Sequence, residues 1–429
     1  MKTFTGLEYL KIDIANAAGQ DKKLFEERLE WFDENIPETV VTMSNQELKE
    51  FVESFTNIDS KELMFTGLIA YKDTFYNKPT GYMCQLDAIS SGASLMSCLM
   101  GDRKGLENTG LLGNKRSDLY TAIYNKMKEI YELPLSYKRD DIKKAAMTFL
   151  YGSIRQPSVI FNNDKDIIEA FWEAVKIEAT GAYMLQQLLT STWNPNATYH
   201  RWILPDLFTA HIPVMVEKEF TYTFTLEDTK IEIPYTLKTE GTKKSSVSNC
   251  ANTIHSCDSL LIREMIRRCM FNKEHVQEVL WYLVNTKEEL YEPIPVNDLM
   301  GLGKLGECIY AYEMSEFCSI RIVDEIKTQA DTYKLSKQHR TKLIDILKRM
   351  LHQGYIEMIA IHDCIKSHAN NMNYIRYWYK EMCADIVESN MLPFLYNQLT
   401  SSKLDSHFLS KEERKAIADD VRKSNYGLS

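Results

Sequence analysis

The sequence predicts a helix-rich α+β protein with two or three subdomains. Three observations lead to this fold class. The 429 residues are 44% hydrophobic and 26% charged, which is a globular composition with enough length for sizeable cores. Apolar residues recur with helical periodicity over most of the chain. A few short runs alternate apolar and polar residues as strands do, and the chain contains no internal repeat.

Helices are expected along the whole chain, and strands in a few short runs. The helical segments span 22–35, 45–55, 116–132, 138–151, 165–190, 258–270, 274–291, 318–330, 339–352 and 371–400. The strand-like runs span 81–86, 202–204, 212–217, 219–225, 230–237 and 355–361. The alternation over 212–237 predicts a hairpin that turns near Glu227 and Asp228. The tract 270–345 is helical and lies between stretches that carry motifs, so we expect an insertion there.

Composition narrows the classes of function. No run of about 18 apolar residues occurs, so nothing is expected to span a membrane, and the N-terminus lacks the apolar stretch of a signal peptide. The nine cysteines include no C-x-x-C pair and indicate a reducing cytoplasm. No zinc-ligand spacing, P-loop or G-x-G-x-x-G motif is present. The net charge of −9 argues mildly against nucleic-acid binding, although a local basic face can coexist with an acidic total.

The stretch KRDDIKKAAMTFLYGS carries four side chains at a spacing of four residues: Arg139, Lys143, Met147 and Tyr151, with Gly152 directly after them. Each step of four advances about 400°, so the four residues lie on one gently curving stripe of a helix about 18 Å long. That length is close to the reach of an extended nucleoside triphosphate. Cations near the helix N-terminus suit phosphates, and the aromatic ring suits a base or a sugar. The alternative is an ordinary amphipathic helix with solvated cations and buried Met and Tyr.

The five-residue pattern R-x-x-x-K-x-x-x-M-x-x-x-Y-G resembles motif B of the single-subunit RNA polymerases of phages and mitochondria. Other stretches follow in that family's order: LKIDIANAAGQDKKLFEER at 10–28, QLDAISSGAS with Asp87 (motif A), NTIHSCDS with His255 and Asp258, and MIAIHDCI with Asp363 (motif C). The resemblance covers residue 10 to the C-terminus, without the tract 270–345. Within the family, the chain is most similar to the large subunit of the heterodimeric phage enzymes called phage RNA polymerase II.

The resemblance implies a nucleotidyl transfer that uses two Mg²⁺ ions. Asp87, at the end of an apolar strand, and Asp363, after a strand expected to be buried, would be the metal ligands. Each aspartate alone would more often be a surface or capping residue. Lys143 would hold the α-phosphate and protonate the leaving group, and Arg139 would take the outer phosphates. Tyr151 would lie by the sugar and the nascent base pair.

The same resemblance bears on the choice of nucleotide. Related DNA polymerases carry an acidic residue at the position of Gly92 and an aromatic residue at that of Met147, so both positions favour ribonucleotides. His255 would lie near the 2′-hydroxyl and the minor groove, and Met147 and Gly152 would complete the nucleotide-binding set. A satisfied, partly buried histidine is the alternative for His255.

Two alternative functions stay open beside DNA-templated RNA synthesis. One is a DNA polymerase of the related A-family type, which Gly92 and Met147 weigh against. The other is a non-catalytic relative that only binds nucleic acid. Retention of the aspartates, the two cations and the tyrosine of the motifs weighs against it.

The resemblance also implies an architecture, a polymerase right hand without the usual N-terminal domain and thumb. The palm would comprise 1–115 and 256–429, and the fingers 116–255. The fingers would carry the motif B helix and a specificity hairpin at about 212–237 that touches promoter or template. The palm's second part would carry the insertion and a C-terminal segment near the active site.

The expected partners are template DNA, nascent RNA and ribonucleoside triphosphates. A smaller second subunit is expected as well, because the family's R-G-R-x-Y element has no counterpart and no Gly-Arg dipeptide occurs in the 429 residues. It would dock near residues 1–30, and an exposed apolar patch would be its footprint. A single-stranded-DNA-binding or promoter-recruiting factor is a further candidate partner. The expected location is the cytoplasm, of the host cell if a phage encodes the protein.

Overall fold

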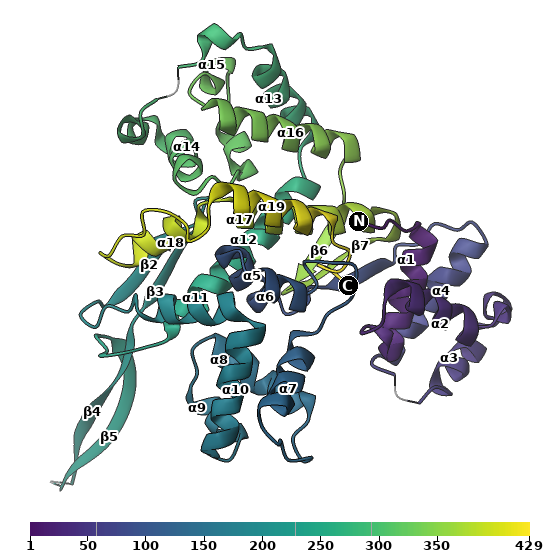
Figure 1. The fold of residues 1–429 in the computed structure, drawn as a ribbon, viewed down its shortest axis with the longest axis horizontal. Coiled ribbons are helices and arrows are strands. Elements are labelled where there is room, and N and C mark those ends of the chain that lie inside the picture. Colours follow the sequence, from purple (N-terminus) through teal and green to yellow (C-terminus); the bar gives the residue numbers. More distant parts are fainter. Residues whose placement is uncertain (57, 228, 293) are drawn as a thin grey trace.

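The structure is a computed structural model that describes residues 1–56, 58–227, 229–292 and 294–429. The fold is helix-rich α+β, as predicted (Figure 1). A three-stranded antiparallel sheet in the order β1-β7-β6 joins segments from near both ends of the chain. Its strands are β1 (Met83–Asp87), β6 (Met358–Ile361) and β7 (Cys364–His368). The middle strand, β7, was not predicted from the sequence.

The N-terminal helices form a lobe at one end of the molecule, to the right in Figure 1. Its elements are α1 (Gly6–Ala15), the π-helix η1 (Asn16–Gln20), α2 (Phe25–Asn35), the 3₁₀ turn η2 (Glu38–Thr42), α3 (Asn45–Glu53) and α4 (Lys61–Phe75). Helix α1 packs against α2, α4 and β1, and thereby ties this lobe to the sheet.

A helical pair covers the sheet from the C-terminal part of the chain. Helix α17 (Met372–Glu388) packs against β7, α5 (Ser91–Met100) and α19 (Lys411–Lys423). The remaining connecting elements are α6 (Arg103–Asn108), η6 (Ala369–Asn371) and α18 (Met391–Leu399). The predicted helix 371–400 is thus two helices, because Ser389 and Asn390 interrupt it.

The helix predicted at 138–151 is confirmed as α8 (Arg139–Leu150). It packs with α7 (Leu119–Ile130) and α9 (Arg155–Ile160), while α10 (Lys165–Glu178) and α11 (Thr180–Thr190) follow. Gly152 has φ 101° directly after the helix, and a Cβ there would lie 2.6 Å from Val247 Cβ. A glycine is therefore required at this helix end.

The predicted hairpin is confirmed as a long, two-stranded ribbon that projects from the body (Figure 1). It consists of β4 (Met215–Leu226) and β5 (Thr229–Glu240), and it follows the smaller pair β2 (Tyr199–Ile203) and β3 (Thr209–Pro213). Strand β4 is continuous where two strands were predicted. Asp228, at the predicted turn, lies outside the described residues.

The tract expected as an insertion forms a helical lobe, at the top of Figure 1. Its elements are α13 (Lys273–Asn285), η3 (Glu288–Leu290), η4 (Val296–Leu302), α14 (Gly303–Ser315), η5 (Ile320–Glu325), α15 (Gln329–Thr332) and α16 (Lys337–Gln353). The helix predicted at 318–330 is wrong. Ser319 caps only a 3₁₀ turn, and Thr328 begins a separate short helix.

Helix α12 (Ser248–Cys269) runs from the base of the ribbon to this lobe. The expected boundary between residues 255 and 256 falls inside it. Among the described residues, no helix combines the length and the apolar character needed to cross a bilayer.

Candidate active site

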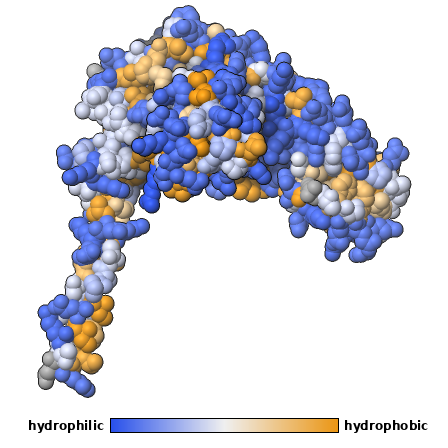
Figure 2. All heavy atoms as spheres, turned by 60° about the horizontal axis from the view of Figure 1, so that its bottom comes forward, coloured by the Kyte–Doolittle hydropathy of each residue, from blue (hydrophilic) through white to orange (hydrophobic). Residues whose placement is uncertain are grey.

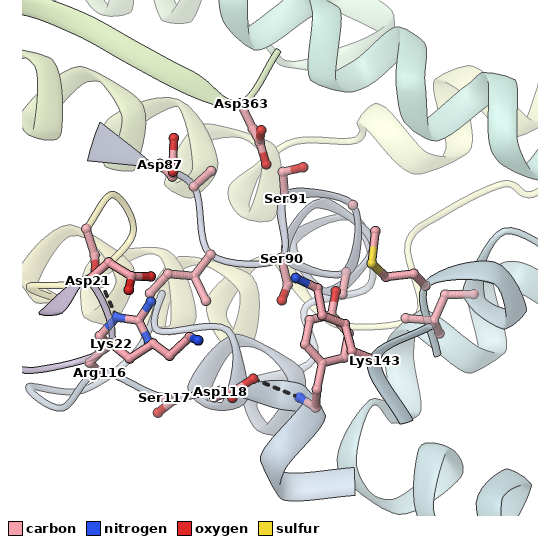
Figure 3. A pocket seen from close by; sticks show the side chains of 18 of the residues that line it. Asp21, Lys22, Asp87, Ser90, Ser91, Arg116, Ser117, Asp118, Lys143 and Asp363 are labelled. Atoms are coloured by element: carbon pink, nitrogen blue, oxygen red, sulfur yellow. Dashed lines mark hydrogen bonds between the residues drawn. The ribbon is translucent and has the colours of Figure 1, made fainter. Parts of the chain in front are cut away.

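The central sheet brings two distant aspartates together. Asp87 ends β1, and Asp363 lies in the turn between β6 and β7, where the preceding His362 has φ 55°. The strands pair in register with Asp87 opposite Cys364, and the Ala88 N–H donates to the Asp363 backbone oxygen at 3.1 Å. Both side chains border the same space (Figure 3). Strand pairing, not sequence proximity, therefore assembles the pair.

The sequence predicted a buried strand before Asp363, and this prediction is wrong. Strand β6 lies at the edge of the sheet, and Ile359 and Ile361 are 49% and 53% exposed. An edge strand is covered on fewer sides than a central one, so its apolar side chains can remain at the surface.

A cavity of about 340 Å³ opens between the sheet, α5 and α8. Its lining comprises Asp21, Lys22, Asp87, Ala88, Ile89, Ser90, Ser91, Gly92, Ala93, Arg116, Ser117, Asp118, Tyr120, Arg139, Lys143, Met147, Leu150, Tyr151, Asp363 and Ser429. Six of the eight expected site residues thus line one cavity. The other two adjoin it, since Gly152 follows Tyr151 and the ring of His255 stacks on that of Tyr151 at 4.9 Å.

The two expected cations of α8 differ in how they are held. The Nε of Arg139 donates to Asp118 Oδ2 at 2.6 Å, and its Nη1 lies 3.1 Å from Asp140. Although burial opposes it, the hydrogen bond from Arg139 lowers the pKa of Asp118. The exposed Lys143 lies 6.0 Å from the Tyr120 ring centre, and within the described part of the chain it has no ion-pair partner. Arg139 is therefore oriented by protein contacts, whereas Lys143 can bind an incoming anion.

Two further cations of the cavity were not identified from the sequence. Lys22 and Arg116 line it, and Figure 3 shows both across the cavity from Asp87 and Asp363. The Nε of Arg116 donates to Ser429 Oγ at 3.0 Å, and burial lowers the pKa of its guanidinium. Lys22 lies in the segment 10–28, which resembles a stretch of the RNA polymerase family. Nothing within that segment identified this lysine as a site residue. Arg116 had no sequence signal.

Helix α5 begins at the cavity wall. Ser90, its N-cap, is in the left-handed region with φ 50° and ψ 54°, and its side chain makes no capping hydrogen bond. The first helical residues, Ser91 to Ala93, line the cavity. Because the first N–H groups of a helix lack intrahelical partners, this terminus adds positive potential beside the four cations.

Gly92 and Tyr151 are in direct contact, which changes the interpretation of Gly92. A Cβ on Gly92 would lie 2.0 Å from the Tyr151 hydroxyl oxygen. The space beside the glycine is thus occupied by Tyr151 in this structure. Burial, with a contribution from Asp258, raises the pKa of Tyr151 to about 12, so the phenol stays protonated at neutral pH.

The donor set fits magnesium only in part. Among the described residues, no group of three or more His, Cys, Asp and Glu side chains could hold a metal ion. Mg²⁺, however, keeps several waters and is typically bound by one or two carboxylates together with substrate phosphates. Asp87 and Asp363 beside a cationic cavity fit that arrangement.

Comparison with known proteins adds a family match. Residues 3–191 match the family described as "DNA-dependent RNA polymerase". Over 167 residues the chain is 28% identical to a Neurospora crassa protein named "Probable DNA-directed RNA polymerase". That alignment covers 34% of this chain and 18% of the relative, so the chain spans a small part of the relative's length. The expected family is confirmed for residues 3–191, which include Asp87 and α8 but neither His255 nor Asp363.

Proposed function

Residues 3–191 belong to the DNA-dependent RNA polymerase family, and from this we propose that the chain catalyses DNA-templated RNA synthesis from ribonucleoside triphosphates. It would act as the catalytic subunit of a split, phage-type polymerase. The observation that supports this most directly is the juxtaposition of Asp87 and Asp363 in a cavity that also contains Arg139 and Lys143. Two carboxylates and a row of cations suit a triphosphate and its magnesium.

Different cations of the cavity bind different phosphates of the triphosphate. Lys143, exposed and without a carboxylate partner, contacts the α-phosphate and donates a proton to the leaving group. Arg139 keeps its Nη2 for the outer phosphates, because Nε and Nη1 are taken by Asp118 and Asp140. Lys22, Arg116 and the start of α5 add positive potential that favours the polyanion.

Two Mg²⁺ ions, when bound, would activate the attacking hydroxyl and stabilise the leaving pyrophosphate. Asp87 and Asp363 would hold them with the nucleotide's own oxygens. Asp87 ends β1, and Asp363 lies in the turn directly before the paired strand β7, so the sheet keeps their backbones together without the metals.

The sugar and base would lie at the other end of α8. Met147, 45% exposed, offers a soft apolar surface, and Tyr151 with the stacked His255 forms a rigid aromatic wall. Tyr151 and His255 face the ribose, and Gly152 permits the turn that follows. A DNA polymerase remains the alternative, and Gly92 and Met147 weigh against it.

The right-hand architecture is part of the proposal. The sheet with its covering helices would be the palm, at 1–115 and 256–429, and α7 to α11 would belong to the fingers, at 116–255. A thumb and an N-terminal domain are not included in this assignment. Contact of the hairpin with promoter or template stays a prediction, as does a cytoplasmic location.

A smaller second subunit completes the proposed enzyme. Support comes from a groove of about 650 Å³ that runs along α1, α4 and the end of β7. Leu7 is 47% and Phe75 64% exposed there, beside the segment 1–30 where docking was expected. Such exposed apolar side chains mark interaction surfaces when they cluster.

Substitution of the metal ligands tests the proposed function. Asp87→Asn or Asp363→Asn should each lower nucleotide addition to a primed template, on the order of 10²–10³-fold or more, because a carboxylate charge at the metals is lost. Template binding, measured by fluorescence anisotropy, should persist. The matched control is Asp324→Asn, on an aspartate that is 63% exposed and does not line the cavity.

Near wild-type extension by either variant would contradict the assignment of that aspartate. Incorporation of labelled deoxynucleotides in preference to ribonucleotides by the wild-type chain would favour the DNA polymerase instead.

A further inference from the structure

Arg28, in helix α2, is a fully buried cation outside the proposed set of site residues. It ends the segment 10–28, which resembles a stretch of the RNA polymerase family. Among the described residues, no carboxylate lies within ion-pair distance of its guanidinium. A buried charge without such a partner is costly unless hydrogen bonds satisfy it, so the atoms that accept those bonds indicate what the residue does.

The guanidinium of Arg28 holds the backbone on both sides of Lys22. Its Nε donates to the Lys23 backbone oxygen at 3.0 Å, and its Nη2 donates to the same oxygen at 2.9 Å and to that of Asp21 at 2.6 Å. Its Nη1 donates to Asn16 Oδ1 at 2.9 Å, at the start of the π-helix before this loop. Lys22 is exposed and lines the cavity, so Arg28 fixes the backbone from which this lysine extends.

The same guanidinium is connected to Arg116 through one hydroxyl group. Ser429 Oγ accepts a hydrogen bond from Arg28 Nη2 at 2.9 Å and another from Arg116 Nε at 3.0 Å. The Ser429 backbone is itself fixed, since its N–H donates to the Asp87 backbone oxygen at 3.0 Å. Because a hydroxyl is uncharged, it orients Arg116 without neutralising it, and Arg116 keeps its charge for an anion.

The charge distribution makes ordered cations important at this wall of the cavity. Hydrophilic side chains cover much of the face of the molecule seen in Figure 2, but the net charge of −9 gives the whole chain little attraction for a polyanion. Burial, with a contribution from the charge of Arg116, lowers the pKa of the Arg28 guanidinium to about 9. A triphosphate would relieve the repulsion between these cations, and cations that are ordered in advance bind it at a lower entropic cost.

We propose that Arg28 is a positioning residue of the nucleotide site, which holds Lys22 and Arg116 where they bind the phosphates of the incoming triphosphate. It acts on Lys22 through the backbone of residues 21–23 and on Arg116 through the hydroxyl of Ser429. Arg28 itself is buried and does not touch the nucleotide. The inference rests on the proposed function, because it requires that a triphosphate occupies the cavity.

Two pairs of variants test the role of Arg28. Arg28→Lys keeps the charge and loses the planar fork that reaches several acceptors. Its matched control is Arg414→Lys. Arg414 is also buried and donates to the backbone oxygens of Glu388 and Ser389, but it does not line the cavity. In the second pair, Ser429→Ala removes the shared hydroxyl without changing any charge, and Ser429→Thr keeps the hydroxyl.

Arg28→Lys should weaken binding of a fluorescent ATP analogue and raise KM for ribonucleotides on the order of tenfold, because the nucleotide itself must then order two cations. The value of kcat should change much less. Ser429→Ala should have the same effects at about 2- to 10-fold, through Arg116 alone. Arg414→Lys and Ser429→Thr should match the wild-type chain in binding and KM, although Arg414→Lys should lower the thermal midpoint as Arg28→Lys does.

A double-mutant cycle separates positioning from a general loss of structure. In an Arg116→Ala background, Ser429→Ala should have little further effect on binding or KM, since the cation that it orients is absent. Equal binding by Arg28→Lys and Arg414→Lys would overturn the inference, as would an effect of Ser429→Ala that is the same with and without Arg116. Should Arg28→Lys fail to fold, the Ser429 variants decide by the same comparison. If the wild-type chain neither binds the analogue nor adds ribonucleotides, the proposed function is itself wrong, and the inference is wrong with it.

Discussion

At the scale of residues, the contact between Gly92 and Tyr151 is the most informative feature. The glycine lacks a Cβ at a point where one would lie 2.0 Å from the tyrosine hydroxyl and 2.8 Å from Cζ. The ring of His255 stacks on that of the tyrosine, at an interplanar angle of 17°. A side chain at position 92 would therefore act on the proposed sugar site by displacing Tyr151.

A double-mutant cycle tests this contact. Gly92→Ala should lower kcat/KM for ribonucleotide addition by about 5- to 150-fold, because overpacking costs about 1–3 kcal/mol. Tyr151→Phe alone should keep ribonucleotide use near normal and relax exclusion of deoxynucleotides by about 1–2 kcal/mol, the contribution of one hydrogen bond. Combined with Tyr151→Phe, the cost of Gly92→Ala should shrink, since the hydroxyl that it strikes is gone. If the effects of the two substitutions on kcat/KM are additive, the contact between residues 92 and 151 does not influence nucleotide addition.

At the scale of elements, Asp13 connects helix α1 to strand β1. Its carboxylate accepts hydrogen bonds from Tyr82 Oη at 2.6 Å and from the Gln85 N–H at 3.0 Å, two residues before Asp87. Burial raises the pKa of Asp13 to about 6, and the negative charge of Asp87 adds to this rise. The two hydrogen bonds and Lys366 oppose it. A buried helix carboxylate thus holds the strand that carries a proposed metal ligand.

The raised pKa predicts how stability depends on pH. Between about pH 4 and 6 the folded protein retains the Asp13 proton while the unfolded chain, with an ordinary value of 3.8, releases it. Stability should therefore fall as pH rises through this window, by about 2–3 kcal/mol from this group. Asp13→Asn should flatten the dependence of the thermal midpoint between pH 4 and 7. Asp324→Asn is the exposed control, and parallel curves for wild-type and Asp13→Asn would contradict the argument.

At the scale of the whole molecule, the chain is acidic while its proposed template is a polyanion. The cations of the cavity suffice for one nucleotide, but the net charge of −9 leaves little general attraction for nucleic acid. Together with the exposed groove along α1 and α4, this supports a partner that contributes basic surface.

The isolated chain is therefore expected to be a poor polymerase. On a single-stranded template it should yield only short products. Template affinity should be weak and should rise only modestly as salt is lowered, because the chain contacts few phosphates. Product length on denaturing gels and binding isotherms at two salt concentrations provide the measurements. Processive synthesis of long RNA by the purified monomer would rule out the partner as a requirement.

Several features could be predicted from the sequence because they are encoded over a few residues. The period of α8, its end at Gly152, the strand that ends at Asp87 and the alternation of the ribbon depend on local backbone preference and side-chain spacing. Motif order also sufficed to predict that the side chains of α8 and the two aspartates belong to one site.

Other features were decided only by the tertiary structure. The pairing of β7 with β1 joins segments whose contact no local pattern encodes, and it moves β6 to the edge of the sheet. Lys22 and Arg116 line the cavity, and Asp118 accepts a hydrogen bond from Arg139. Tyr151 occupies the space beside Gly92. Each of these depends on which surfaces pack together across long stretches of chain. Packing at that range is set by the shape and charge of the whole core, which periodicity within a short window does not contain.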